Sequence, residues 1–315
     1  MRTLFDALQW AEQKKIALGH FNIAGLEQLK AIAGTAKRLD VPVIIGVSEG
    51  EREYIGLDEV RVLCDAYNRE WGTPAGFWLF VNADHTHSIE KAGEAAVAGF
   101  DEVLFDGGKL PFEENIRQTN EAIRTIKQRS SWRHRVVVEG ELGYIGSSSE
   151  IRTGIPDGAA ISPEDLTKPE EAVRFVNETG VDMLAPAVGN IHGMLVRQNP
   201  QDGGGDGPVY SDPPLDISRI KAIKDALREA RGRSVPLVLH GGSGNTDADF
   251  SAAIDAGITI IHISTELRLA WRKGLEQALK DNPDEIAPYK IMPVAIAAME
   301  KVVEQRLKLF SRLDR

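Results

Sequence analysis

The chain has 315 residues, of which 42% are hydrophobic and 27% are charged, so it is long enough for one large barrel or two smaller domains. Its formal net charge of -10 at pH 7 argues against a nucleic-acid surface, because a phosphate backbone requires a basic stripe. The single cysteine, Cys64, excludes an internal disulfide, and its helical surroundings predict a small core residue rather than a reactive thiol.

The N-terminal segment is amphipathic and contains acidic residues. It reads "MRTLFDALQWAEQKK" and has neither an apolar signal core nor a small-residue cleavage site. No stretch of the chain reaches the length needed to cross a bilayer. We therefore expect a cytoplasmic protein that binds neither nucleic acid nor membrane.

Short β-rich runs alternate with helical patterns from one end of the chain to the other. The predicted strands cover residues 16–22, 42–48, 76–83, 102–106, 135–141, 182–188, 235–240 and 258–264. The helical patterns, in which apolar residues recur every three or four positions, include residues 26–39, 88–98, 112–128, 216–230 and 247–256. The strands are nearly continuous apolar runs, as in a parallel sheet that is covered on both faces.

Eight strands with intervening helices predict an α/β fold, a (β/α)₈ TIM barrel that forms a single domain over residues 1–315. An open doubly wound sheet is the alternative. That fold would show a Gly-rich turn after its first strand, where "HFNIAGLEQ" offers only Gly25. Two connections, 142–166 and 189–214, are too long for ordinary loops, and we expect them to lie over the active-site face.

Two further helical patterns follow the eighth strand, at residues 266–282 and 292–313. The second is an additional C-terminal helix that the barrel itself does not need. Its apolar stripe predicts packing on the barrel or on a partner subunit. We expect a homodimer or a homotetramer.

Three histidines come at the ends of predicted strands. His85 closes the third strand, His192 follows the sixth, and His240 ends the seventh. The carboxyl ends of barrel strands converge on one mouth, so these side chains can meet across 155 positions of chain (240 minus 85). Three neutral imidazoles with an open fourth position form a common shell for a catalytic divalent metal, typically zinc. The alternative is a set of unrelated core or loop histidines.

The remaining histidines have weaker patterns. His20 lies inside the first strand and His134 at the start of the fifth, and we interpret both as structural. His87 is ambiguous, because "DHTH" resembles the His-x-His pair of metal hydrolases.

Asp84 directly precedes His85 at the end of a buried strand. Successive strand side chains point to opposite faces, but where the strand ends the backbone turns and both can reach the mouth. His85 would then hold the metal while Asp84 moves protons beside it. An aspartate that itself binds the metal is the alternative.

A glycine-rich turn, "HGGSGNTDADF", joins the seventh strand to a helix. Its glycines let backbone N–H groups approach an anion, and the start of the helix adds a favourable dipole. Barrels often build a phosphate site from the loops after strands seven and eight, and "ISTE" supplies the hydroxyls of Ser264 and Thr265. A tight connection is the alternative for the turn alone, but its place beside "ISTE" favours a phosphate site at Gly241 and Ser243.

Seven segments carry a family resemblance when taken in order: "FNIAGLEQ", "PVIIGVSEG", "ADH", "AGFDEVLFDGGKLPFEENI", "VEGELGYIG", "LAPAVGNIHG" and "PLVLHGGSG". Together they are similar to the class II, metal-dependent ketose-bisphosphate aldolases, which include fructose-1,6-bisphosphate and tagatose-1,6-bisphosphate aldolases. The resemblance covers about residues 14–275, and barrel architecture alone would not produce this order of motifs.

The resemblance implies roles for individual residues. The zinc-ligand positions are matched by His85, His192 and His240, and the catalytic acid position is matched by Asp84. Asp106 and Glu141 match acidic positions that hold a second or displaced ion, divalent or monovalent, with an internal network at the barrel mouth as the alternative. The substrate and mobile-loop positions are matched by Asn22, Ser48, Glu150, Gly193, Gly241, Ser243, His262, Ser264 and Thr265.

Several residues depart from the family pattern. Val196 stands where many members carry a lysine for phosphate, with Arg197 next, and "APYK" replaces a basic pair near the C-terminus. His262 stands where an asparagine usually lies beside the bound ketone. Because an imidazole changes charge near neutral pH, we predict that a protonated His262 partly compensates for the missing lysine, assisted by Arg197. The alternative is a neutral His262 that only forms hydrogen bonds.

The implied activity is reversible cleavage of fructose 1,6-bisphosphate into dihydroxyacetone phosphate and glyceraldehyde 3-phosphate, with zinc as Lewis acid and Asp84 as acid and base. Tagatose 1,6-bisphosphate or another ketose phosphate is the alternative substrate. A metal-dependent hydrolase that pairs His85 with His87 is more remote, because that pair usually lies on the first strand. A non-catalytic phosphosugar-binding protein would be expected to lack Asp84 or a ligand histidine. A Schiff-base aldolase needs a lysine at the mouth, and no predicted strand ends in one.

Overall fold

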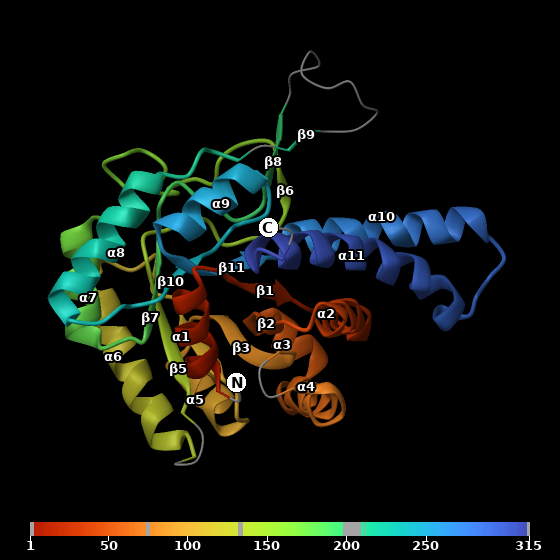
Figure 1. Ribbon diagram of the computed structural model, residues 1–315, viewed down its shortest axis with the longest axis horizontal. Coiled ribbons are helices and arrows are strands. Elements are labelled where there is room, and N and C mark those ends of the chain that lie inside the picture. The colour runs from red at the N-terminus through yellow and green to blue at the C-terminus, as the bar shows by residue number, and fades with distance from the viewer. Residues whose placement is uncertain (1–2, 74–75, 132–134, 198–208, 211, 314–315) are drawn as a thin grey trace.

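A closed barrel of eight parallel strands forms the centre of the molecule (Figure 1). The computed structural model describes residues 3–73, 76–131, 135–197, 209–210 and 212–313. The barrel strands are β1 (Leu18–Asn22), β2 (Pro42–Val47), β3 (Trp78–Thr86), β4 (Glu102–Phe105), β5 (Val137–Leu142), β7 (Met183–Pro186), β10 (Leu237–Leu239) and β11 (Ile258–Ile263). They pair in this order, and β11 closes the ring on β1. The predicted α/β TIM barrel is confirmed.

Each predicted strand overlaps one barrel strand, and their ends differ by at most three residues. The largest difference is at β3, which continues through the polar segment 82–86. Its last residue, Thr86, still pairs with Phe105 of β4. The acid and the histidine of "NADHT" therefore lie on the strand's last residues, at the mouth of the barrel.

Helices surround the barrel on its outer face. They are α2 (Leu26–Leu39), α3 (Glu49–Ile55), α4 (Leu57–Trp71), α5 (Ile89–Val97), α6 (Phe112–Arg129), α7 (Pro169–Thr179), α8 (Ile217–Arg231), α9 (Asp247–Ala256) and α10 (Thr265–Asp281). Their apolar stripes bury large side chains against the strands, such as Phe175 of α7 and Phe250 of α9. Cys64 on α4 is fully buried, and this burial raises the pKa of its thiol to about 12, as predicted for a core residue.

The inside of the barrel has two kinds of layer. Near the amino ends of the strands the inward side chains are apolar, and they include Leu18, Ile44, Phe80, Val137, Met183, Val238 and Ile260. Helix α1 (Leu4–Lys14) covers this layer with the apolar side chains Leu4, Ala7, Leu8 and Ala11. Two residues further along four of these strands the inward positions are polar: His20, Asn82, Glu139 and His262. The polar layer lies between the apolar plug and the mouth.

The two long connections contain short strands, which the sequence did not predict. They are β6 (Ile151–Arg152), β8 (Met194–Arg197) and β9 (Val209–Tyr210), paired in the order β6-β8-β9. Residues 198–208 and 211 of the second connection lie outside the described residues. Both connections contribute residues to the cavity at the mouth.

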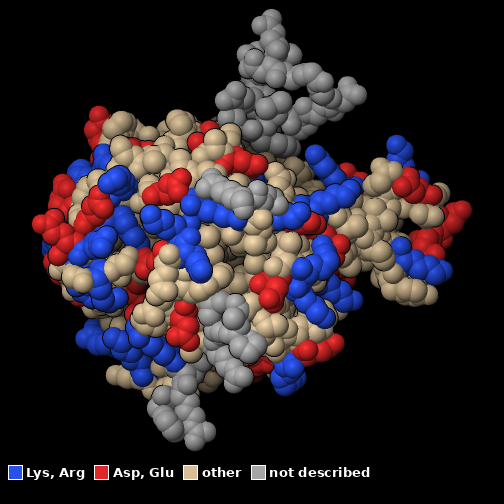
Figure 2. All heavy atoms as spheres, in the orientation of Figure 1, with Lys and Arg blue, Asp and Glu red and all other residues tan. Residues whose placement is uncertain are grey.

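The additional C-terminal helix is α11 (Pro288–Phe310). It forms an antiparallel pair with α10 that extends beyond the barrel past α2 (Figure 1). The end of α11 nearest the barrel is buried through Val303, Leu307 and Phe310, whereas Ile286 and Tyr289 at the far tip are 89% and 77% exposed. Acidic and basic side chains are interspersed over the barrel and this helix pair in Figure 2. None of the helices in the described part of the chain combines the length and apolar character needed to span a bilayer.

Candidate active site

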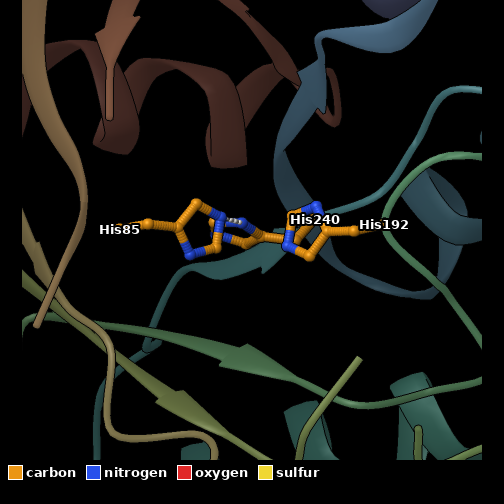
Figure 3. A group of neighbouring side chains, drawn as sticks. All are labelled: His85, His192 and His240. Carbon is orange, nitrogen blue, oxygen red and sulfur yellow. Dashed lines mark hydrogen bonds between the residues drawn. The ribbon is translucent and has the colours of Figure 1, made fainter. Parts of the chain in front are cut away.

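Three imidazole rings meet at the mouth of the barrel (Figure 3). His85 belongs to the end of β3, His192 follows β7 and His240 follows β10. His85 Nε2 lies 3.3 Å from His240 Nδ1. One ring nitrogen from each histidine lies within 4.8 Å of the other two. The fold therefore brings together the three histidines predicted to share a site.

Acidic side chains orient two of these rings. Nδ1 of His85 lies 2.8 Å from Asp106 Oδ2, and Nε2 of His240 lies 2.8 Å from Glu139 Oε1. Because a carboxylate accepts the ring N–H, the opposite nitrogen keeps its lone pair toward the centre of the site. Nε2 of His192 is buried and has no hydrogen-bond partner among the described residues. Burial lowers the pKa of His192 well below its ordinary value and that of His240 to about 3. These nitrogens fit a divalent metal with an open coordination position.

The backbone turns sharply at the end of β3. His85 has φ +40°, in the left-handed region that few residues other than glycine adopt. The buried guanidinium of Arg52 holds the chain here, donating to the carbonyls of Val47 at 2.7 Å and Asp84 at 3.2 Å and to the hydroxyl of Thr86 at 3.0 Å. Both Asp84 and His85 therefore line the same cavity although they are adjacent on a strand.

Asp84 is buried, with 2% of its surface exposed. Asn22 Nδ2 donates to its Oδ2 at 2.8 Å, while its Oδ1 lies 3.6 Å from His262 Nδ1 and 3.9 Å from His85 Nε2. Burial opposes ionisation, but the neighbouring His85 and His20 and the hydrogen bond from Asn22 hold the pKa of Asp84 well below its usual range. The carboxylate is thus ionised beside the three-histidine group.

Asp106 and Glu141 form the acidic side of the mouth. Glu141 Oε2 lies 3.7 Å from His85 Nδ1, and the two carboxylates with His85 form a second group of close donor atoms. Burial raises the pKa of Glu141 well above its usual range. Burial disfavours a charged His85, but Asp84 and Asp106 outweigh this and raise the pKa of its ring well above the ordinary value. The local potential therefore favours a cation at this point.

A cavity of about 470 Å³ opens at the mouth. The predicted residues that line it are Asn22, Ser48, Asp84, His85, Asp106, Glu150, His192, Gly193, Gly241, Ser243, His262, Ser264 and Thr265. His240 and Glu141 are absent from this lining because they lie deeper, in contact with His85.

One end of the cavity is formed by the loops after β10 and β11. Gly241 has φ +59°, and a Cβ there would lie 2.1 Å from the carbonyl oxygen of Ile191, so only glycine fits this close backbone approach. Ser243 Oγ accepts a hydrogen bond from the backbone N–H of Ser264 at 3.3 Å. The hydroxyl of Ser264 is buried without a partner among the described residues, directly before the first turn of α10 at Thr265. This end presents backbone and hydroxyl donors suited to a phosphate.

Comparisons with known proteins decide the family. A model of the family described as fructose-bisphosphate aldolase class-II matches residues 2–315. The chain belongs to the class II fructose-bisphosphate aldolase family. As a member, this class II aldolase is a metal-dependent aldehyde-lyase, and the family acts on phosphorylated sugars.

Solved structures support this membership. The YdjI aldolase from Escherichia coli K12 is 28% identical, with 98% of this chain and 96% of that chain covered and a TM-score of 0.72. The fructose-bisphosphate aldolase from Campylobacter jejuni is 18% identical, with 98% and 93% covered and a TM-score of 0.71. At 18% identity, the similarity to the Campylobacter jejuni structure concerns the fold alone.

The charge predicted for His262 in this aldolase is wrong. Its ring stacks on His20 with the centroids 3.4 Å apart and the planes 4° from parallel. Burial, reinforced by His20 and His240, lowers the pKa of His262 well below its ordinary value. A neutral His262 cannot replace the positive charge of the missing lysine at Val196. The alternative, a neutral ring within the barrel, is the one that the structure supports.

Glu150 lies on the loop that covers the aldolase cavity. Its carboxylate is 59% exposed and lies 3.0 Å from the guanidinium of Arg152. Arg152 also donates to the carbonyl of His192 at 3.1 Å, which ties this loop to one of the three histidines. At Gly193, with φ +103°, a Cβ would lie 2.5 Å from the Glu150 carbonyl oxygen. The backbone of the loop therefore packs directly on the histidine segment.

The other candidates lie apart from the three-histidine group. His87 has a side chain 58% exposed and places Nδ1 3.2 Å from the carbonyl oxygen of Asp106. Lys109, the lysine in the loop after β4, is not a lining residue of the cavity, and it extends over the ring of Tyr144, 4.8 Å from its centroid. His134 lies outside the described residues.

Two acidic residues that support the site from below were not predicted from the sequence. Glu139 contacts His240, and the fully buried Glu102 lies on the neighbouring strand. Alternation along a strand was an available signal, because Glu139 is two positions from Glu141 and must share its face. The stacking of His20 on His262 had no such signal.

Proposed function

We propose that this class II aldolase reversibly cleaves a ketose phosphate and releases dihydroxyacetone phosphate, using Zn²⁺ held by His85, His192 and His240. The observation that carries the proposal is the convergence of one ring nitrogen from each of three histidines beside an ionised, buried Asp84. Fructose 1,6-bisphosphate is the first substrate to assay and tagatose 1,6-bisphosphate is the second. A second divalent ion or a monovalent cation would be held at Asp106 and Glu141.

Different residues of the cavity would bind different parts of the substrate. The phosphate of the dihydroxyacetone half would lie against Gly193, Gly241, Ser243, Ser264 and Thr265. The donors there are backbone N–H groups, hydroxyls and the start of α10, which favour an anion.

Proton transfer would rest on Asp84. A bound divalent metal supplies Lewis-acid polarisation of the ketone oxygen. Asp84 accepts the proton of the C4 hydroxyl as the C3–C4 bond breaks, C4 becomes the aldehyde carbon, and the electron pair of the bond stays with the C3 fragment. Glu150, which is exposed and can take up a proton from solvent, would then deliver that proton to C3. Asn22 holds the Asp84 carboxylate in place throughout.

Metal dependence tests the proposal. EDTA should abolish cleavage, and zinc, cobalt or manganese should restore it, because the chain places no lysine among the described residues lining the cavity for a Schiff base. Full activity of the metal-free protein, or trapping of substrate on a lysine by borohydride, would overturn the proposal. A hydrolase that pairs His85 with His87 is disfavoured by the exposed position of His87.

We further propose that residues 1–315 form one catalytic domain that assembles into a homodimer or a homotetramer. The exposed apolar side chains Ile286 and Tyr289 at the tip of the α10–α11 pair support an assembly. Light scattering after size-exclusion chromatography measures its mass.

A further inference from the structure

The two ends of the aldolase cavity differ in chemistry, and this difference bears on the second product. We propose that the aldehyde released or accepted with dihydroxyacetone phosphate has an uncharged, hydroxyl-bearing tail, so that the preferred substrate is a ketose 1-phosphate rather than a ketose bisphosphate. This inference rests on the proposed function and names the substrate class of the same site.

The position of the tail follows from the order of the strands. The phosphate end lies at β10 and β11, and in the closed ring β2 and β3 lie on the other side of β1. Asp84, which acts on the C4 hydroxyl, is on β3. Carbon atoms beyond C4 would therefore extend toward the loops after β2 and β3 and the loop that carries Glu150. The residues lining this far end are Ser48, Glu49, Gly50, His87, Ser147, Ser148, Ser149 and Glu150.

Carboxylates occupy the far end. Partial burial opposes ionisation of Glu49, but the hydrogen bonds from Lys91 and from the backbone of His87 hold the pKa of its carboxyl below the usual value. Glu150 on the facing loop is 59% exposed. At the N-terminal turn of α3, the buried carboxylate of Glu51 accepts from the backbone N–H of Ser48 at 2.8 Å, which adds a third acidic side chain near this end. A phosphate dianion here would be repelled by these carboxylates.

Positive charge at this end is already paired. Among the described lining residues, the single lysine or arginine is Arg268, which lies on the first turn of α10 between the two ends of the cavity and has a side chain 41% exposed. Its Nη2 donates to Glu51 Oε1 at 2.6 Å and its Nη1 to the carbonyl of Ser149 at 3.2 Å. Lys91, behind Glu49, donates to Glu49 at 2.9 Å and to Glu53 at 2.6 Å.

The other polar groups at the far end of the cavity are serine hydroxyls. Ser147 and Ser148 are exposed to the cavity, and each offers a donor and an acceptor. Carboxylates accept hydrogen bonds from sugar hydroxyls but repel phosphate oxygens. The far end is thus suited to a polyhydroxylated chain.

The test compares pairs of aldehydes in the condensation direction, using the zinc-loaded protein and dihydroxyacetone phosphate. The pairs are glyceraldehyde with glyceraldehyde 3-phosphate, and erythrose with erythrose 4-phosphate. We expect kcat/KM to be at least about tenfold higher for the unphosphorylated member of each pair. Equal values, or a preference for the phosphorylated member, would overturn the inference.

A second measurement separates this inference from the proposed function. Exchange of the C3 hydrogen of dihydroxyacetone phosphate in D₂O needs no aldehyde. If the protein catalyses this exchange but prefers the phosphorylated aldehydes, the inference is wrong and the proposed function is retained. The same conclusion follows if the protein catalyses the exchange but condenses none of the four aldehydes. Absence of exchange overturns the proposed function, and the inference falls with it.

A charge introduced at the far end provides a matched variant. Ser148→Arg adds a guanidinium facing the proposed tail, and Ser148→Gln adds comparable polar length without charge. One charge-assisted hydrogen bond should raise kcat/KM for glyceraldehyde 3-phosphate roughly tenfold in Ser148→Arg relative to Ser148→Gln. No difference between the two variants would mean that the tail lies elsewhere.

Discussion

At the scale of single residues, Asp84 combines burial with ionisation. Its carboxylate accepts from Asn22, and Asn22 in turn donates to the buried Glu51 at 3.0 Å. Glu51 is paired with Arg268. This chain of contacts holds the Asp84 carboxylate next to the histidines.

Replacement of Asp84 should separate catalysis from metal binding. Asp84→Asn keeps the size of the side chain but cannot accept a proton, and we expect kcat to fall by about 10²- to 10⁴-fold, the span of a positioned acid or base. Metal content, measured by elemental analysis, should stay at the level of the unmodified protein. A metal content near zero in Asp84→Asn would show that Asp84 is a ligand.

The neutral state of His262 makes a prediction about phosphate binding. Burial keeps its pKa well below the ordinary value, so its charge does not change between about pH 6 and 8. The affinity for dihydroxyacetone phosphate, corrected for phosphate ionisation, should follow the same pH profile in the unmodified protein and in His262→Asn. Calorimetric titration at several pH values measures both, and a steeper loss of affinity in the unmodified protein would restore a charged His262.

His20 should make stability depend on pH. Burial lowers its pKa from 6.5 to about 4. Between these values the unfolded chain binds a proton that the folded chain does not, so the stabilisation is complete above pH 6.5 and is lost as pH falls toward 4. The shift corresponds to about 3 kcal/mol. Urea unfolding of the metal-free protein should show a shallower pH dependence over this window in His20→Ala, and parallel curves for the two proteins would contradict the assignment.

At the scale of elements, the packing of strands β1 and β2 depends on a glycine, Gly46 of β2, which has no side chain. Gly46 of β2 pairs with Asn22 of β1, and a Cβ on Gly46 would lie 2.0 Å from the His20 ring. His20 is fully buried and stacked on His262, so its ring has no space into which to move. The glycine is therefore what allows an imidazole to point into the barrel at this level.

A double-mutant cycle tests this fit. Gly46→Ala should lower the free energy of unfolding by about 1–3 kcal/mol through overpacking. In a His20→Ala background the ring is gone, and the same substitution should cost much less. Denaturant unfolding of the four proteins gives the coupling energy. Equal costs in the two backgrounds would mean that the His20 ring is not the obstacle.

At the scale of the whole molecule, α1 closes the end of the barrel opposite the active site. Leu8 is 2% exposed and belongs to the cluster that includes Phe80 and Ile44 inside the barrel. We expect Leu8→Ala to lower the free energy of unfolding by about 2–5 kcal/mol, because it leaves a cavity in this cluster. Val97→Ala, at a side chain 67% exposed, is the control and should change stability by less than about 0.5 kcal/mol. Unfolding in urea compares them, and similar values for both would show that α1 is not needed to close the barrel.

The barrel and the three-histidine group were predictable because both depend on local pattern. Apolar runs of strand length recur in order along the chain, and each of the three histidines stands within or just beyond the end of such a run. Parallel strands in a barrel bring their carboxyl ends to one mouth, so the predicted topology alone places His85, His192 and His240 together. The glycine-rich turn after β10 was predictable because it too is a local sequence pattern.

The sequence by itself therefore determined the order of the strands, the side of the barrel that carries the site, and the residue types available there. Only the tertiary structure decided the charge of His262, the pairing of Glu139 with His240 across 101 positions, and the covering of the apolar layer by α1. Local pattern records which face of an element is apolar, but not which distant element covers it. A pKa depends on the solvent removed and the charges gathered by the whole fold, and neither exists before the chain has folded.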